Sequence, residues 1–220
     1  MAKVQGVKEK IHWPMHDTFF VKDEFKSGNS GPKKTFTDFM ANDPRVIRFF
    51  VDVQNKTKLE TNLQAPSVLP SLNTFEARAL RVAISNLRYE KKDDKIDKHA
   101  QFNESEILAD LIYNSVTSLI VGEKVMIEMP TFWFPSGAGV SPGFPTVSNH
   151  GAPDPTATFR FAEPVHFASQ QTFRVEMTFP HGVPGTTSDP NKPDPNKLAG
   201  VTGPFRVWVV LDGYLTRDVQ

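Results

Sequence analysis

Residues 171–179 read QTFRVEMTF, and the alternation within this stretch decides the fold class. Its apolar residues recur at every second position, as Phe173, Val175, Met177 and Phe179, with polar side chains between them. Successive side chains of a β-strand point to opposite faces, so this pattern predicts a strand with one face in a hydrophobic core. We therefore expect this part of the chain to belong to a β-sheet.

Other stretches of the chain predict further strands and one helix. Strands are predicted for RVIRFFVDVQ (45–54), FEARALRVAISNLRY (75–89), SLIVGEKVMIEMPTFWF (118–134), FRFAEPVHF (159–167) and FRVWVVLDGYLTRDVQ (205–220). We expect residues 118–134 to form one or two strands, because Gly122 within them marks a turn or bulge. A short helix is predicted after Asn103, which is followed by Glu106 as in a capping box and precedes the apolar stripe of ESEILADLIYN.

The composition fits a single β-rich domain. The chain has 220 residues, a length at which an all-β sandwich commonly forms one domain. Its 18 prolines and 13 glycines suit loops, and its 18 phenylalanines suit the interior of a sheet. These proportions favour a sandwich or a barrel.

Long segments without alternation separate or precede the predicted strands. Residues 1–44 contain several lysines and the short apolar pair Phe19 and Phe20, and we expect them to form an extended N-terminal arm. Residues 135–155 and 181–204 are two long loops rich in Pro and Gly. Loops of this length are uncommon in compact domains and usually serve a function or contact something.

Cysteine content and charge exclude several classes of function. The chain has no cysteine, which removes disulfides, thiol chemistry and Cys-ligated metal sites. Its 25 basic and 25 acidic residues balance, so the molecule as a whole has no field that attracts nucleic acid. The sequence lacks a signal-peptide pattern and an apolar run long enough to span a bilayer, so we expect a soluble protein.

The histidines and loop aspartates do not predict a metal site. His12 and His16 have the spacing of a helical metal site, but Pro14 between them disfavours the helix. Asp189 and Asp194 lie in the near-repeat DPNKPDPNK, where calcium is conceivable. The prolines and lysines of that repeat favour a rigid loop without an ion. We therefore expect neither a metal nor a cofactor.

The sequence also contains no convincing catalytic motif. Glu128, Glu163 and Glu176 lie on predicted strands, where each suits an outward polar position, although paired carboxylates also support glycoside hydrolysis. Residues 139–143, GVSPG, match the GxSxG nucleophile pattern, but Pro142 has no N–H for an oxyanion hole. We expect a protein that is not an enzyme, and a β-sandwich hydrolase stays an alternative.

The C-terminal part of the chain resembles a known family. PVHFASQQTFRVEMTF (164–179), a long loop and then FRVWVVLDGYLTRDVQ are similar to the closing strands of viral jelly-roll capsid proteins. Residues 45–220 resemble the upright single-jelly-roll capsid proteins of tailless icosahedral viruses, including membrane-containing bacteriophages. The resemblance implies an all-β fold, with residues 45–220 forming one jelly-roll β-sandwich with a short helix and residues 1–44 forming the arm.

The resemblance also implies a structural role in the virion. Copies of the chain would self-assemble into an icosahedral shell through the sandwich, the arm and the loops. The expected partners are other copies in a capsomer and other capsid proteins, with the arm reaching an internal membrane or the genome, and no small-molecule substrate. The candidate partner-contact residues lie in the arm and near or within the loops: Phe19, Phe20, Trp133, Phe144, Asp189 and Asp194.

A second function is compatible with the same sequence. Phe132, Trp133 and Phe134 precede the Gly-rich loop and suit a sugar-stacking platform, an exposed partner-binding patch or buried core. A monomeric β-sandwich that binds a carbohydrate or a receptor through Trp133 and residues 135–155 is therefore the alternative to a shell protein.

Overall fold

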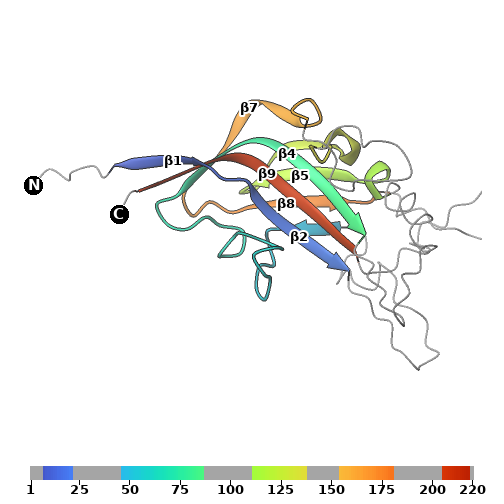
Figure 1. The fold of residues 1–220 in the computed structure, drawn as a ribbon, viewed down its shortest axis with the longest axis horizontal. Helices are drawn as coiled ribbons and strands as arrows, with labels where there is room; N and C mark the ends of the chain where they lie inside the picture. The colour runs from blue at the N-terminus through green and yellow to red at the C-terminus, as the bar shows by residue number, and fades with distance from the viewer. Residues whose placement is uncertain (1–6, 22–45, 87–110, 138–153, 181–204, 219–220) are drawn as a thin grey trace, which may run out of the picture.

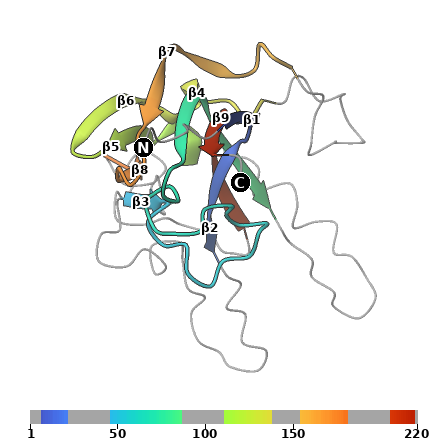
Figure 2. The same cartoon turned by 90° about the vertical axis from the view of Figure 1, so that its left-hand side faces the viewer.

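The computed structural model describes residues 7–21, 46–86, 111–137, 154–180 and 205–218. Within these ranges nine strands form two antiparallel sheets, which pack face to face (Figure 1, Figure 2). The expected all-β sandwich is thereby confirmed. Within the same ranges, no helix combines the length and the apolarity needed to cross a bilayer.

The first sheet is built around the long C-terminal strand β9. Its strands, in spatial order, are β1 (Lys8–His12) with β2 (Met15–Val21), then β9 (Phe205–Asp218), β4 (Thr74–Asn86) and β7 (Phe159–Phe167). Both β1 and β2 pair with β9 and lie end to end along it. Trp13 and Pro14 separate them, and the Trp13 N–H donates to the carbonyl of Gly213 at 3.0 Å. The two short strands therefore act as one interrupted edge strand.

The second sheet contains the strand whose alternation predicted the fold. Its strands, in spatial order, are β3 (Val46–Phe49), β8 (Phe173–Thr178), β5 (Val116–Val121) and β6 (Lys124–Pro130). In β8 the residues Phe173, Val175 and Met177 are buried and alternate with half-buried polar residues, as expected. Gly122, with φ +61°, makes the tight turn between β5 and β6.

The strand pairing is nested. If β1 and β2 count as one strand, the first strand pairs with the last, β3 with β8, β4 with β7 and β5 with β6. Pairs β4–β9 and β5–β8 then join these ribbons into the two sheets. With β1 and β2 counted as one, the described strands alternate between the two sheets along the chain, except at the β5–β6 hairpin.

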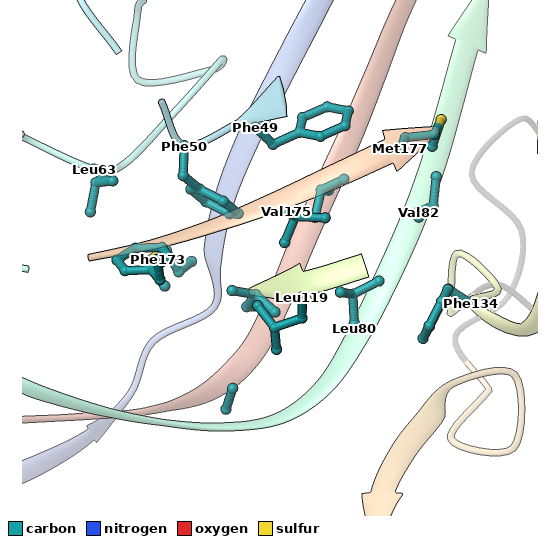
Figure 3. Close-up of a cluster of buried hydrophobic side chains, with 14 of the residues drawn as sticks. Phe49, Phe50, Leu63, Leu80, Val82, Leu119, Phe134, Phe173, Val175 and Met177 are labelled. Carbon is teal, nitrogen blue, oxygen red and sulfur yellow. The ribbon is translucent and has the colours of Figure 1, made fainter. Parts of the chain in front are cut away.

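Phenylalanines join the two sheets inside the core, and Figure 3 shows Phe50 and Phe173 among the buried side chains. Phe167 of β7 and Phe173 of β8 stack with their ring centroids 4.8 Å apart and their planes inclined by 5°. Phe75 continues the stack on the first sheet at 5.6 Å, and Phe50 continues it on the second at 5.5 Å. Aromatic pairs of this kind add about 0.5–1.5 kcal/mol to the stabilisation from buried area.

Part of the expected N-terminal arm belongs to the sandwich. The described residues 7–21 of the arm form β1 and β2, and Met15 is fully buried opposite Leu211. Sequence alternation did not indicate β2, because the buried Asp17 interrupts its inward face between Met15 and Phe19. Residues 1–6 and 22–44 of the arm lie outside the described ranges.

Asp17 is a buried carboxylate that binds both a backbone N–H and a lysine. Its Oδ2 accepts a hydrogen bond from the Phe50 N–H at 2.6 Å, and its two oxygens lie 2.8 and 3.1 Å from Lys56 Nζ. Burial raises the pKa of Asp17 above its ordinary value, although Lys56 and the hydrogen bonds oppose this shift. The interaction ties β2 of the first sheet to the chain leaving β3 of the second.

The helical segments differ in part from the expectation. Residues 111–113 are helical, whereas the preceding part of the predicted helix lies outside the described ranges. An unexpected 3₁₀ turn, η1 (Thr131–Trp133), follows β6 where a strand was predicted to continue. Pro130 ends the strand there, since it cannot donate to a sheet ladder.

Candidate functional site

Three exposed aromatic side chains gather beside η1. Tyr113 is 69% exposed, Phe132 47% and Trp133 51%, and we call these three residues the aromatic patch. Large exposed aromatic groups that lie together are unusual on a monomer and commonly mark a contact surface. Among the residues that the structure describes, the other large exposed apolar side chains lie before β1, in connections or on β6: Val7, Val51, Leu59, Leu72, Val125 and Met126.

The rings of the aromatic patch form a continuous row. The ring centroids of Tyr113 and Phe132 are 6.1 Å apart and their planes are inclined by 28°. Those of Phe132 and Trp133 are also 6.1 Å apart, with an inclination of 31°. Trp133 then meets the half-buried Phe159 of β7 edge to face at 6.5 Å. The row therefore extends from the helical residues 111–113 to the edge strand of the first sheet.

A buried hydroxyl cluster holds η1 in place beneath the patch. The Ser115 hydroxyl donates to the Leu111 carbonyl at 2.6 Å, and its oxygen lies 2.7 Å from the hydroxyl oxygen of Thr131. The hydroxyl oxygen of Thr117 lies 2.8 Å from that of Thr131 on the other side. The Thr131 N–H also donates to the Ser115 carbonyl at 2.9 Å. Because all three hydroxyl groups are buried and paired, the first residue of η1 is fixed to β5.

Phe134 fixes the other end of η1. Its side chain is 1% exposed and packs against Phe159 at right angles, with ring centroids 5.4 Å apart. Its carbonyl accepts a hydrogen bond of 3.1 Å from the Val82 N–H of β4, and Figure 3 shows the Phe134 ring beside that strand. Phe132 and Trp133 therefore project from a turn that is anchored to both sheets.

The chain after η1 is held by Arg81. The guanidinium of Arg81 donates to the Ser136 carbonyl at 3.1 Å and pairs with Asp212 at 2.6 Å. Gly137, with φ +86°, lies so close to Arg81 that a Cβ at this position would come within 3.0 Å of an Arg81 nitrogen. The Gly137 carbonyl also accepts from the Asp154 N–H at 3.2 Å. Residues 137 and 154 are therefore adjacent. They lie close to the two ends of the predicted loop 135–155.

The outer face of the second sheet is polar and internally paired. Glu176 of β8 forms ion pairs with Arg48 at 3.3 Å and with Arg174 at 2.7 Å. Ser118 of β5 donates to the carboxylate of Glu128 on β6 at 3.0 Å. These contacts place polar groups on all four strands of this face.

The outer face of the first sheet is also charged. Glu76 of β4 pairs with both Lys10 and Arg78, and these hydrogen bonds lower the pKa of its carboxyl group. The charged groups of Lys10 and Arg78 each lie 5.0 Å from the ring centroid of Tyr214. These cations therefore already have both a carboxylate and an aromatic ring as partners.

The structure does not bring the predicted partner-contact residues together. Trp133 belongs to the aromatic patch, whereas Phe19 and Phe20 lie on β2, at the edge of the first sheet opposite β7. Phe19 packs against the core, and the Phe20 ring lies 4.7 Å beneath the guanidinium of Arg206. The other three predicted residues lie outside the described ranges: Phe144, Asp189 and Asp194.

Sequence analysis did not single out Tyr113 as a contact residue. The predicted helix placed its buried stripe on other residues, of which Leu111 is buried as expected. Tyr113 lies next to that stripe, so the same periodicity that predicts Leu111 as buried also predicts Tyr113 as exposed. Its position beside Phe132 required the three-dimensional structure, because 19 residues of chain separate them.

The carboxylates considered for hydrolysis lie on two different sheets. Glu128 and Glu176 face Ser118 from opposite sides on the outer face of the second sheet, whereas Glu163 lies exposed on β7 of the first. Within the described ranges, no three residues of the His, Cys, Asp or Glu type are grouped as metal ligands.

Comparison with known proteins does not assign the chain to a family. No family model matches it, and no curated protein matches its sequence. The strand order and the surface chemistry therefore carry the functional argument.

Proposed function

We propose that this chain is a viral capsid structural protein with a jelly-roll fold, and that its copies assemble into an icosahedral shell. The nested strand pairing carries the proposal. A jelly roll forms when a long antiparallel ribbon wraps into two four-stranded sheets, which produces this order of pairs. Capsid proteins are one of the main groups built on that fold, beside lectins and cupins.

The distribution of charge supports assembly by lateral packing. Charged side chains on both outer faces are already paired with one another, as with Arg48 and Glu176 or Arg81 and Asp212. The exposed aromatic rings lie instead beside η1 and the sandwich edge formed by β7. A sandwich that tiles a shell contacts its neighbours through its sides, so apolar groups there suit a structural, non-catalytic role.

The proposed location is the virion of a tailless virus, with membrane-containing bacteriophages included in that class. The proposed partners are copies of this chain in a capsomer and other capsid proteins. Lysines occur in residues 22–34 of the arm, and contact of this segment with an internal membrane or the genome stays a prediction.

Electron microscopy of the purified full-length chain tests this proposal. Negative-stain images should contain rings, sheets or closed shells of regular subunits. Removal of the whole predicted arm is unsuitable as a test, because residues 8–21 belong to the first sheet and their loss would expose the β9 edge. Uniform small particles at every protein concentration would contradict the proposal.

The aromatic row favours one other candidate function, a monomeric carbohydrate-binding module. Neighbouring exposed aromatic rings such as Phe132 and Trp133 provide flat apolar surfaces on which a sugar ring can lie. Titration of the monomer with oligosaccharides, followed by Trp fluorescence, tests this function. Binding that disappears in Trp133→Ala, without loss of the folded state, would favour the module over the shell protein.

A further inference from the structure

We infer that residues 57–62 form a strap that closes the edge of the first sheet at β2 and prevents this strand from pairing with a strand of a second copy. The strap lies in the connection between β3 and β4, which passes β2 in Figure 2. Among the described strands, β2 pairs only with β9, so its other side is a sheet edge. This role is independent of the proposed function, because it concerns an association that the fold suppresses.

Asn62 occupies the place of a neighbouring strand beside β2. The His16 N–H donates to Oδ1 of Asn62 at 3.0 Å, and the Asn62 N–H donates to the His16 carbonyl at 3.4 Å. The side-chain amide of Asn62 also donates to the Pro14 carbonyl at 2.8 Å. The Thr61 hydroxyl donates to the His16 carbonyl at 3.0 Å. The backbone groups of Pro14 and His16 that an added strand would use are therefore already hydrogen-bonded.

The strap also extends over the outer face of β2. The His16 Nε2 lies 3.3 Å from the Lys58 carbonyl oxygen, and Trp208 Nε1 of β9 donates to the Leu59 carbonyl at 3.4 Å. Thr18 lies opposite Trp208 on the same face and is only 1% exposed. The strap therefore covers both the edge and the outer face of this part of the sheet.

Hydrogen bonds within the strap and anchors at its ends hold it in place. The N–H and the hydroxyl of Thr57 donate to the Glu60 carboxylate at 2.8 and 3.0 Å, and the Glu60 N–H donates to the Thr57 carbonyl at 2.9 Å. Before the strap, Lys56 pairs with the buried Asp17 at 2.8 Å. After it, Leu63 is buried in the core. The strap is therefore a fixed part of the fold.

The other described edge strands have protection within their own sequences. Proteins prevent edge-to-edge pairing of identical chains with charged residues, prolines, bulges or very short strands. β1 (KEKIH) and β6 (KVMIEMP) carry charged residues, β7 contains Pro164, and β3 has only four residues. In β2 (MHDTFFV) the one acidic or basic residue besides His16 is Asp17, which is buried. The strap therefore supplies the protection that the sequence of β2 lacks.

Removal of the Asn62 side chain tests the inference. Asn62→Ala leaves the His16 N–H without its acceptor and the Pro14 carbonyl without its donor. Thioflavin T fluorescence, which reports strands joined edge to edge in stacked sheets, should rise about tenfold faster than for the natural chain. Hydrogen exchange at His16, measured by mass spectrometry of peptides covering β2, should also become about tenfold faster.

Asn73→Ala is the matched control. It removes the same side chain from the same β3–β4 connection and retains the Asn73 N–H, which donates to the Pro70 carbonyl at 3.1 Å. This variant should show the dye signal and the exchange rate of the natural chain. Near-ultraviolet circular dichroism verifies that each variant is folded.

A proline on the uncovered edge separates edge pairing from simple loss of stability. Proline is accepted on an edge strand where the N–H faces away from the sheet, as that of His16 does, and it prevents a further strand from bonding there. His16→Pro/Asn62→Ala should therefore return the dye signal to the rate of the natural chain, although it also removes the contact between His16 and Lys58. If this double variant is folded and associates as fast as Asn62→Ala, the inference is overturned. If it does not fold, the comparison of Asn62→Ala with Asn73→Ala decides.

The outcomes separate the strap from the proposed function. Equal dye signals for the natural chain and Asn62→Ala would overturn the inference, and the shell proposal would stand if both proteins form the same particles. If the natural chain is monomeric at every concentration, the proposed function fails. A faster dye signal in Asn62→Ala, but not in Asn73→Ala, would then still support the strap.

Discussion

The Asp17 carboxylate accepts a hydrogen bond of 2.6 Å from the backbone N–H of Phe50, which lies 33 residues further along the chain. Phe50 has φ +68°, a left-handed conformation that is unfavourable for a side chain of its size. Its ring is nevertheless fully buried against Phe173. The buried hydrogen bond therefore helps to hold a strained residue where the chain passes between the sheets.

The effect of replacing Asp17 on the free energy of unfolding should depend on whether the substitute keeps a hydrogen-bond acceptor. Asp17→Ala leaves the buried Phe50 N–H unpaired and removes the partner of Lys56, so we expect a loss of about 3 kcal/mol in the free energy of unfolding. Asp17→Asn retains an oxygen for the Phe50 N–H but loses the charge that pairs with Lys56, so it should cost less than Asp17→Ala, about 1–2 kcal/mol. Denaturant unfolding measures both values. Glu9→Gln, which removes an exposed pair with Arg217, is the control and should change stability by less than about 0.5 kcal/mol.

The raised pKa of Asp17 predicts a specific pH dependence. The folded state keeps the Asp17 proton at pH values where the unfolded state has lost it, so the folded state binds more protons in that window. The contribution of Asp17 to stability should therefore be greatest below its ordinary pKa and decline as the pH rises through the raised pKa. We therefore expect the difference in unfolding free energy between the natural chain and Asp17→Asn to fall as the pH is raised from 3. A difference that rises with pH would contradict the direction of the shift.

Gly213 is expected to be intolerant of any side chain. A Cβ at this position of β9 would lie 2.1 Å from the Glu76 carbonyl oxygen and 2.8 Å from the Phe75 ring, where β4 has its bulge. Gly213→Ala should therefore lower the unfolding free energy by about 3 kcal/mol. Gly122→Ala is an informative control, because nothing lies within 4 Å of its Cβ and only the positive φ opposes it. Thermal unfolding of Gly122→Ala should show a loss of about 1 kcal/mol in the unfolding free energy.

The hydroxyl cluster beneath the aromatic patch gives a prediction that links stability to the site. Thr131→Val keeps the shape of the side chain but leaves the hydroxyl groups of Ser115 and Thr117 without their shared partner, and should cost about 2 kcal/mol. Because η1 is then less firmly held, Trp133 fluorescence should become more accessible to acrylamide in a background with Trp13 and Trp208 replaced by Phe. Unchanged quenching would show that Phe134 alone fixes the turn.

Sequence periodicity predicted the strands that have one clean apolar face. The stretches containing β4, β8 and β9 alternate strictly enough to show both the strand and its inward face. The strand predicted at 45–54 is shorter in the structure: β3 ends at Phe49, and the left-handed backbone of Phe50 buries Phe50 and exposes Val51. β2 was missed because a buried, paired aspartate looks like a surface residue until Lys56 and Phe50 are seen beside it. A local pattern contains no information about such distant partners.

The candidate site was predictable only in part. Sequence reasoning left Phe132, Trp133 and Phe134 undecided between surface and core, because it saw only large aromatic residues before a Gly-rich segment, and it named Trp133 alone as a contact residue. The structure buries Phe134 and exposes the other two, since the 3₁₀ turn after Pro130 breaks the alternation of the strand. Tyr113 joins them through chain folding, which no sequence spacing indicates.

The molar mass of the natural chain in solution tests the central claim most directly. Light scattering over a wide concentration range should show species many times heavier than the 24.6 kDa chain, with a discrete or closed size distribution. Such masses are what a self-assembling shell protein requires. A single species of 24.6 kDa at every concentration would contradict the account and direct attention to ligands of the aromatic patch.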